Sequence, residues 1–270
     1  MKPSKMRGSH RGLYELSHEK LSEIDRVIVS GDIHGDYESL QRIRDLFDPS
    51  QDFLIFLGDY ADRGPKGIEV IDGVRELVRK YPDRAIAMKG NHEDYSKSGA
   101  PSFAPCDLMH EAYEKRNGWP SYFEGVLRPF LDELYLAVLI PGEVLFVHGG
   151  ISNKIRSVND LRRPSRQIEK DVLWSDPFGG YGERPNMRGI GIEFGKDVSE
   201  RVCQRLGIKR IVRGHQPRKA RGGPYVEHDG RVITISSTII YGGTPFVLAL
   251  PSKELDRAFR HLEGYVVSLR

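Results

Sequence analysis

The chain has 270 residues, of which 39% are apolar and 29% are charged, a composition typical of a globular protein. Its 41 basic and 38 acidic residues leave a formal charge of +3, which is too small to indicate a nucleic-acid-binding protein. No apolar run approaches the roughly 20 residues of a membrane-spanning helix, and only two cysteines are present, so we expect a cytoplasmic protein without membrane association.

The first part of the chain alternates short apolar runs with segments of helical periodicity. Apolar runs at residues 27–30, 53–57 and 85–88 predict three buried strands. Between them, apolar residues at helical spacing predict helices over 37–47 and 68–81. This β-α-β-α-β order is typical of a largely parallel sheet.

The rest of the chain predicts more helices and then hairpins. Residues 106–133 read as two helices separated near Gly118 and Pro120, and a strand pair over 134–147 turns at Pro141-Gly142. After a segment that we expect to be rich in loops come a helix and four strands, at 198–206, 209–213, 225–228, 232–237 and 246–250. The expected fold class is α/β (α+β), with two mixed β-sheets packed as a central β-sandwich and flanked by helices.

Five of the apolar runs end directly in polar residues that can bind metal ions. These segments are "VIVSGDIHG" (27–35), "FLIFLGDYADRG" (53–64), "AIAMKGNHE" (85–93), "VLFVHGG" (144–150) and "IVRGHQ" (211–216). Ligands of open α/β sheets bind outside the carboxyl ends of the strands. The five ends should therefore gather six side chains at one rim: Asp32, His34, Asp59, Asn91, His148 and His215.

Each motif alone has an ordinary structural interpretation, because Gly-Asp is a common turn and a single histidine is often only hydrogen-bonded. The combination favours a shared site, since four of the nine histidines, His34, His92, His148 and His215, occupy glycine-flanked strand ends. Histidine together with aspartate suits zinc, iron or manganese. Six or seven ligand atoms exceed the needs of one tetrahedral ion, so we expect two ions roughly 3.5–4 Å apart.

The expected charge of this centre indicates the kind of substrate. Two divalent ions bring four positive charges, while Asp32, Asp59 and a bridging hydroxide offset about three of them. The remaining positive charge would attract a phosphate dianion and stabilise the charge that develops during displacement at phosphorus.

These motifs, with "LWSDP" (173–177), "RGIGIEFG" (188–195) and "ISSTIIYGG" (235–243), resemble the phosphoprotein phosphatase (PPP) family of serine/threonine phosphatases, within the calcineurin-like metallophosphoesterases. The compact length is most similar to prokaryotic, especially archaeal, members. The resemblance implies the metallophosphoesterase fold and a catalytic domain at 26–250. Residues 1–25 would be a basic tail and lead-in, and residues 251–270 a C-terminal segment that packs on the same domain.

The resemblance also implies a role for each site residue. The first ion would be held by Asp32, His34 and Asp59, and the second by Asp59, Asn91, His148 and His215. His92 would be the general acid, oriented by Asp62. The phosphate would be bound by Arg63, Arg188, Asn91 and Tyr241, although Thr238, Ile239 and Ile240 depart from the "APN" that usually stands in the family before this tyrosine.

The function implied is hydrolysis of phosphoserine and phosphothreonine in proteins by direct attack of a metal-bridging hydroxide. Manganese is the first expectation for the two divalent ions, with iron or zinc as alternatives. Phosphorylated proteins would be the partners, and no regulatory subunit is indicated. Two alternatives remain open. One is a related enzyme that acts on dinucleoside polyphosphates, phosphotyrosine or small phosphoesters, and the other is a non-catalytic binding module on the same fold.

Overall fold

The computed structural model describes residues 11–270, so most of the predicted basic tail lies outside the described residues. The first half follows the predicted β-α-β-α-β order through β2 (Arg26–Ser30), α2 (Tyr37–Leu46), β3 (Asp52–Phe56), α3 (Gly67–Lys80) and β4 (Ala85–Ala87). Strand β3 pairs in parallel with β2 on one side and β4 on the other. The prediction for this half is confirmed to within one or two residues at each boundary.

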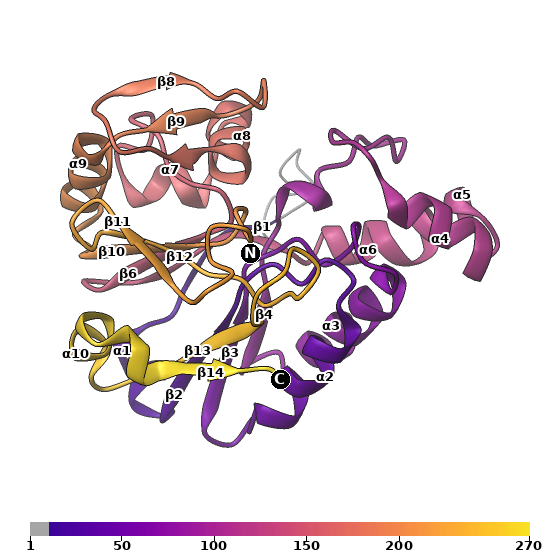
Figure 1. Ribbon diagram of the computed structural model, residues 1–270, viewed down its shortest axis with the longest axis horizontal. Coiled ribbons are helices and arrows are strands. Elements are labelled where there is room, and N and C mark those ends of the chain that lie inside the picture. Colours follow the sequence, from indigo (N-terminus) through magenta and orange to yellow (C-terminus); the bar gives the residue numbers. More distant parts are fainter. Residues whose placement is uncertain (1–10) are drawn as a thin grey trace, which may run out of the picture.

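Two mixed sheets form the centre of the molecule (Figure 1). The five-stranded sheet has the order β14-β13-β2-β3-β4, completed by β13 (Phe246–Pro251) and β14 (Val266–Ser268). The six-stranded sheet has the order β1-β5-β6-β10-β12-β11. Its strands are β1 (Arg11–Glu15), β5 (Tyr135–Ile140), β6 (Val144–Val147), β10 (Arg210–Arg213), β11 (Tyr225–Glu227) and β12 (Val232–Thr234). The predicted pairs β5–β6 and β11–β12 are antiparallel hairpins.

The two sheets share one apolar core because alternate residues of each strand point to opposite faces. Val27 and Val29 of β2 are fully buried in one cluster with Val138 of β5 and Phe146 of β6, which belong to the other sheet. Ile28 points the opposite way, into the cluster that contains the apolar faces of α2 and α3. The predicted β-sandwich is therefore confirmed.

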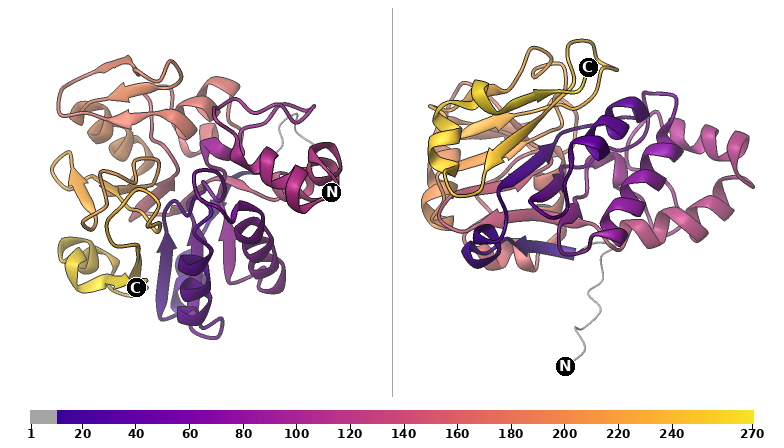
Figure 2. Two further views of the ribbon diagram at one scale, coloured as in Figure 1. Left: turned by 45° about the vertical axis from the view of Figure 1, so that its right-hand side comes forward. Right: turned by 90° about the horizontal axis from the view of Figure 1, so that it is seen from below.

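Helices flank the sandwich on both outer sides (Figure 2). Beside α2 and α3 lie α4 (Asp107–Lys115), α5 (Trp119–Tyr122), the π-helical η2 (Phe123–Leu127) and α6 (Arg128–Leu131). On the other side lie α7 (Val158–Arg162), α8 (Arg166–Trp174) and α9 (Lys196–Leu206). The shorter helices are α1 (His18–Ser22), η1 (Asn91–Glu93), α10 (Leu255–Arg260) and η3 (Leu262–Tyr265). Within residues 11–270, every helix is too short or too polar to cross a bilayer.

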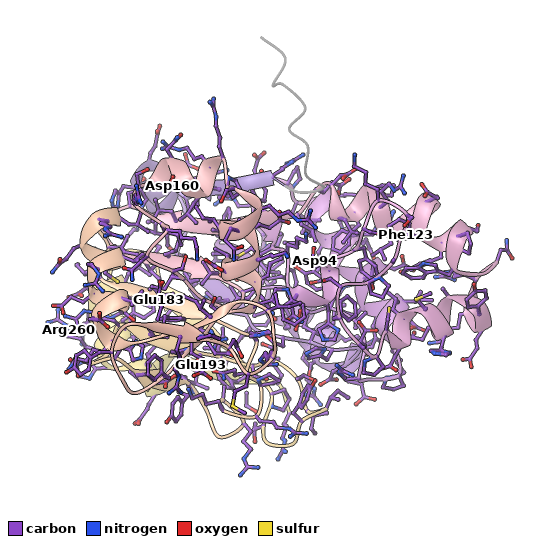
Figure 3. All side chains as sticks on the ribbon, turned by 90° about the horizontal axis from the view of Figure 1, so that it is seen from above. Asp94, Phe123, Asp160, Glu183, Glu193 and Arg260 are labelled. Carbon is purple, nitrogen blue, oxygen red and sulfur yellow. The ribbon has the colours of Figure 1, made fainter. Side chains whose placement is uncertain are left out.

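The middle segment is more ordered than we predicted. Besides α7 and α8, it forms a third sheet of order β7-β9-β8, from β7 (Asp176–Pro177), β8 (Glu183–Pro185) and β9 (Ile192–Phe194). The segments of β7 and β8 contain no apolar run that would predict a strand, and all of β8 is exposed. Figure 3 shows Glu183 and Glu193 on this small sheet, well separated from Phe123 in the helical lobe.

Candidate metal centre and phosphate pocket

The six predicted metal ligands converge just beyond the carboxyl ends of five strands. Asp32 and His34 follow β2, Asp59 follows β3, and Asn91 follows β4. His148 and His215 follow β6 and β10 of the other sheet. All six side chains are buried, and none is more than 5% exposed. The centre therefore lies where the two sheets meet, and both sheets contribute to it.

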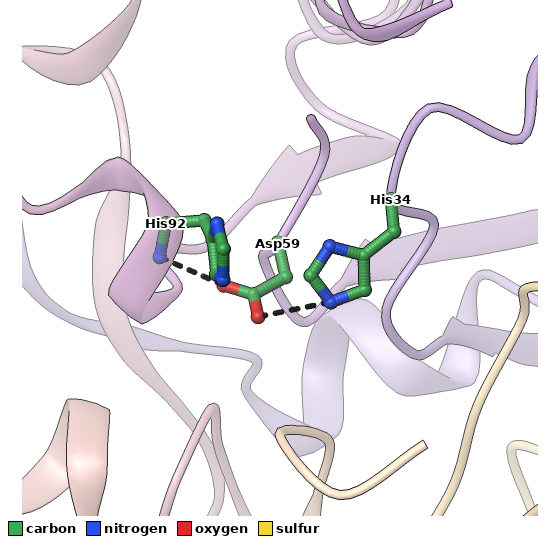
Figure 4. A group of neighbouring side chains, drawn as sticks. All are labelled: His34, Asp59 and His92. Carbon is green, nitrogen blue, oxygen red and sulfur yellow. Dashed lines mark hydrogen bonds and ion pairs between the residues drawn. The ribbon is translucent and has the colours of Figure 1, made fainter. Parts of the chain in front are cut away.

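The carboxylate of Asp59 belongs to two groups of side chains that could hold a metal ion. Its Oδ2 lies 3.4 Å from Nε2 of His34, and its Oδ1 lies 3.3 Å from Nε2 of His148. The ligand atoms within each group lie no more than 4.8 Å apart, and the groups are His34, Asp59 and His92, and Asp59, His148 and His215. Figure 4 shows the Asp59 carboxylate between His34 and His92. Asp59 is thus the residue that the two groups share.

Around the second group, two imidazoles and the amide oxygen of Asn91 lie within hydrogen-bond distance of one another. Nδ1 of His148 lies 3.0 Å from the carbonyl oxygen of Leu57 and donates its proton there, so Nε2 of the neutral ring carries a lone pair. That atom is 3.0 Å from Oδ1 of Asn91, which in turn is 2.7 Å from Nδ1 of His215. Imidazole nitrogens together with amide and carboxylate oxygens are ligands that manganese, iron and zinc accept, so this set of side chains fits a divalent ion.

Beside the first group lies a buried acceptor without a hydrogen-bond partner among the described residues. Oδ2 of Asp32 is fully buried and has no hydrogen-bond partner among the described residues, although it lies 3.8 Å from Nε2 of His34. Nε2 of His34 is free to bind an ion, because Nδ1 contacts the carbonyl oxygen of Ala61 at 3.0 Å. A carboxylate oxygen buried without compensation is costly, and a metal ion at this place would compensate it. The residues therefore fit the metal that the sequence predicts.

The pKa values of these groups reflect the buried carboxylates of Asp32 and Asp59, which favour a positive charge beside them. Burial alone would lower the pKa of His148, yet the carboxylates of Asp59 and Asp32 outweigh it and raise that pKa to about 9. Burial raises the pKa of Asp32, and the neighbouring Asp59 carboxylate adds to this effect. The same carboxylates would stabilise a bound cation, which would replace the proton on His148.

His92 lies next to Asp59 and is held by Asp62. Nδ1 of His92 lies 2.8 Å from Oδ2 of Asp62, whose Oδ1 accepts a hydrogen bond from the backbone N–H of Leu108. The imidazole also packs on Phe103, with ring centres 4.4 Å apart. Burial lowers the pKa of His92, but Asp59 and Asp62 outweigh it and the net pKa is raised. The ring is thus fixed by Nδ1, which leaves Nε2 available to a substrate.

The predicted phosphate-binding residues line one cavity of about 470 Å³ next to this centre. Arg63, Arg188 and Tyr241 share it with three predicted metal ligands, Asn91, His34 and His215. The ring of Tyr241 lies 5.3 Å from the ring of His34. The cavity therefore brings two guanidinium groups and the metal centre to the same space, as binding of a phosphate group requires.

Asp176 and Arg213 belong to the site but were not predicted. Arg213 is fully buried and donates from Nη2 to Oδ1 of Asp176 at 2.9 Å, while Nε of Arg188 donates to Oδ2 of the same carboxylate at 3.0 Å. Asp176 thus connects Arg188, which lines the cavity, to the buried Arg213. Both residues stand in motifs that we noted, "LWSDP" and "IVRGHQ", but nothing in their spacing indicates that they pair.

The backbone of the site is strained where side chains must converge. The described residues other than glycine with a left-handed φ include five site residues: His34, Asp59, Asp62, Arg63 and His215. Such conformations each cost roughly 1–3 kcal/mol and persist only where the surroundings enforce them. One such support is Glu93, whose carboxylate accepts hydrogen bonds from the backbone N–H groups of Asp59, Tyr60 and Gly90. The spacing of residues in the motifs does not predict that these residues adopt a left-handed backbone conformation.

Residues 25–219 match the family model described as calcineurin-like phosphoesterase. The chain belongs to this family. Within it, the chain is 35% identical over 211 residues to serine/threonine-protein phosphatase PP1-delta of Caenorhabditis elegans, which covers 74% of this chain and 67% of the relative. It is 33% identical over 208 residues to serine/threonine-protein phosphatase C23G10.1 of the same organism, which covers 73% of this chain and 44% of the relative. The predicted resemblance to the PPP family is therefore confirmed.

The fold of the calcineurin-like phosphoesterases is confirmed by a solved structure. A protein serine/threonine phosphatase from Saccharomyces cerevisiae with similarity to human phosphatase PP5 superposes with a TM-score of 0.74 at 24% identity, over 90% of this chain and 77% of that one. The chain therefore has the metallophosphoesterase fold. It spans less than half of one of the two C. elegans relatives and about two thirds of the other.

Proposed function

We propose that this member of the calcineurin-like phosphoesterases is a metal-dependent serine/threonine protein phosphatase. The observation that carries the proposal is the Asp59 carboxylate, which joins two metal-binding groups beside an imidazole held by Asp62. A cavity lined by Arg63 and Arg188 opens on this arrangement. The named C. elegans relatives, both serine/threonine-protein phosphatases, support the choice of phosphoserine and phosphothreonine as substrates.

We assign the metal ligands around the two groups that share Asp59, adding Asp32 and Asn91 and keeping His92 as the general acid. Asp32, His34 and Asp59 would hold one divalent ion, and Asp59, Asn91, His148 and His215 would hold the other. When bound, the ions supply Lewis acidity and an activated water molecule that attacks phosphorus directly. Mixed nitrogen and oxygen ligation suits manganese, which we propose, and also iron or zinc.

The side chains around the centre would bind the phosphate and handle the proton. Arg63 and Arg188 would bind phosphate oxygens through their planar guanidinium groups, with Asn91 and Tyr241 completing the pocket. His92 would protonate the leaving oxygen of serine or threonine from Nε2, and Asp62 would hold the ring and favour its charged form. No residue needs to form a covalent phosphoenzyme.

The setting we propose is the cytoplasm, with phosphorylated proteins as partners. Cys106 and Cys203 are both free thiols, as in a protein that folds under reducing conditions.

The proposal is tested by supplying chelated protein with manganese, iron or zinc in turn. Turnover is then measured on phosphoserine, phosphothreonine and phosphotyrosine peptides and on diadenosine tetraphosphate. We expect manganese to restore hydrolysis of the phosphoserine and phosphothreonine peptides most strongly. Faster turnover of diadenosine tetraphosphate than of either peptide would instead assign the chain to the dinucleotide alternative.

A further inference from the structure

The loop that follows the ligand His215 forms one wall of the phosphate cavity. Gln216, Pro217, Arg218 and Lys219 all line this cavity. The loop is anchored by two backbone hydrogen bonds, from Lys219 N–H to the Gln216 carbonyl at 2.9 Å and from Thr244 N–H to the Arg221 carbonyl at 3.1 Å. It therefore holds its side chains at a defined place beside the loop that carries Tyr241.

Arg218 is an exposed cation on this wall without an acidic partner. Within residues 11–270, no carboxylate forms an ion pair with its guanidinium. Of the other cations that line the cavity, Arg188 contacts Asp176 at 3.0 Å, Lys219 contacts Glu227 at 2.7 Å, and Arg63 is a proposed phosphate-binding residue. Arg218 is thus the charged group of the wall that is free to bind an external anion.

The position of Arg218 places that anion beside the phosphate and not on it. Its Cζ lies 5.7 Å from the centre of the Tyr241 ring, and Tyr241 in turn contacts the ring of His34. Tyr241 therefore connects Arg218 to the proposed metal centre through contacts with both. An extended peptide advances about 3.3 Å per residue, so a residue one or two positions from a bound phosphoserine would reach Arg218.

The charge of the cavity wall favours an acidic substrate. Four cationic side chains line the cavity, Arg63, Arg188, Arg218 and Lys219, against one carboxylate, Asp59, which is a proposed metal ligand. A substrate with neutral or basic residues next to its phosphoserine would leave Arg218 without a partner. A carboxylate at one of these positions would form a charge-assisted pair with Arg218.

We infer that Arg218 is a specificity residue that binds a carboxylate next to the phosphorylated residue, so that acidic phosphopeptides are preferred substrates. This inference rests on the proposed function and narrows its substrate class.

The experiment uses phosphoserine peptides in which one aspartate is moved through the positions on either side of the phosphoserine, with an all-alanine peptide as reference. For the unaltered chain we expect kcat/KM to be about three- to tenfold higher for the best aspartate peptide, the range of a partly exposed ion pair. Arg218→Gln should remove this preference and keep kcat/KM on the alanine peptide within twofold. Added salt should weaken the preference as well, because exposed charges are screened.

Arg221→Gln is the matched control, because Arg221 is an exposed arginine of the same loop that does not line the cavity. It should retain the aspartate preference. Calorimetry with a non-hydrolysable phosphonate analogue of the best peptide gives a second readout, in which Arg218→Gln should lose the same factor in affinity.

Three outcomes overturn the inference. Equal kcat/KM on aspartate and alanine peptides in the unaltered chain would overturn it while the phosphatase proposal stands. An Arg218→Gln effect confined to diadenosine tetraphosphate would assign Arg218 to a second phosphate of a small molecule. Absence of any phosphoserine hydrolysis would overturn the proposed function itself, and the inference with it.

Discussion

Two hydrogen bonds fix the imidazole that we propose as the general acid: Nδ1 of His92 bonds to Asp62, and Asp62 is itself held by the backbone of Leu108. His92 is 6% exposed and Asp62 fully buried, so the pair has little freedom to rearrange. The ring therefore needs no reorganisation before it transfers a proton, and this idea can be separated experimentally from metal binding.

Replacing His92 with asparagine should slow turnover of a phosphoserine peptide by roughly 10²–10⁴-fold, because proton transfer to the leaving oxygen is lost. Metal content, measured by elemental analysis, should stay at the level of the unaltered chain, since His92 is not one of the six proposed ligands. An aryl phosphate with a good leaving group should be affected much less. Full activity of this variant on the peptide would show that His92 is not the acid.

Replacing Asp32 should raise or leave unchanged the stability of the metal-free protein and at the same time lower its affinity for metal. Its Oδ2 is buried without a partner, and burial raises its pKa, so its charge destabilises the metal-free protein. Asp32→Asn removes this charge and retains an oxygen for the backbone N–H of His215, a bond of 2.9 Å. We expect the metal-free variant to melt at the same temperature or about 2–4 °C higher, which corresponds to about 1 kcal/mol.

The same variant should bind manganese at least about tenfold more weakly, because an amide is a poorer ligand than a carboxylate. Calorimetric titration of metal-free protein measures this affinity. A variant that melts lower than the unaltered metal-free chain and binds manganese equally well would show that Asp32 is structural.

At the scale of elements, the ends of strands β2, β3, β4, β6 and β10 must approach one another closely to build the centre. Glycines make this possible: a Cβ on Gly58, whose φ is +107°, would overlap the backbone of Gly90, and one on Gly214 would overlap Oδ1 of Asp32. The strand ends are therefore packed backbone against backbone. This close approach explains why the motifs carry glycine next to each ligand.

The carboxylate of Asp176 in β7 links β10 to the phosphate cavity and predicts a specific pH dependence. Burial raises its pKa, but Arg213, His215 and Arg188 outweigh this effect and lower it from 3.8 to about 2. Because the folded pKa is depressed, this stabilisation is fully present above pH 3.8 and is lost as the pH falls towards 2. A shift of this size corresponds to about 2 kcal/mol of unfolding free energy.

Asp176→Asn should therefore lose about 2 kcal/mol of stability at neutral pH, or more because Arg213 is left buried without its charged partner. Between pH 4 and 2 its unfolding free energy should fall less steeply than that of the unaltered chain. Urea denaturation measures the unfolding free energy at neutral pH and its slope between pH 4 and 2. The protein is kept metal-free with a chelator, so that release of metal at low pH does not contribute to the difference. Parallel pH curves for the two proteins would contradict the assignment.

The strand ends and the polar residues that converge there could be predicted from sequence because each lies within a few residues of an apolar run, and apolar runs of strand length are a local signal. The third sheet could not, because its strands β7 and β8 are short and contain no apolar run. Helix α8 was missed although Ser165 caps it through the backbone N–H of Ile168. The pair of Asp176 and Arg213 was missed because residues 37 positions apart meet only in three dimensions.

At the scale of the whole molecule, the proposed metal ligands join the two sheets of the sandwich. Asp32, His34, Asp59 and Asn91 follow strands of the five-stranded sheet, and His148 and His215 follow strands of the six-stranded sheet. Ions bound to both sets would bridge the sheets. Metal binding should therefore stabilise the entire fold and not only the local loops.

Chelation should accordingly lower the melting temperature by several degrees, and manganese should restore it in a concentration-dependent way. At 100 times its dissociation constant, one ion would add about 2.7 kcal/mol to the unfolding free energy. Asp59→Asn, which alters the shared ligand, should respond much less to manganese in the same thermal scans. A melting temperature that is indifferent to both chelator and manganese would contradict this bridging role.

Anomalous diffraction from crystals soaked in manganese tests the account most directly. It predicts two anomalous peaks, one contacted by Asp32, His34 and Asp59 and the other by Asp59, Asn91, His148 and His215. A single peak, peaks at other places, or no peak between these side chains would contradict the claim that the strand ends of both sheets build a two-ion centre.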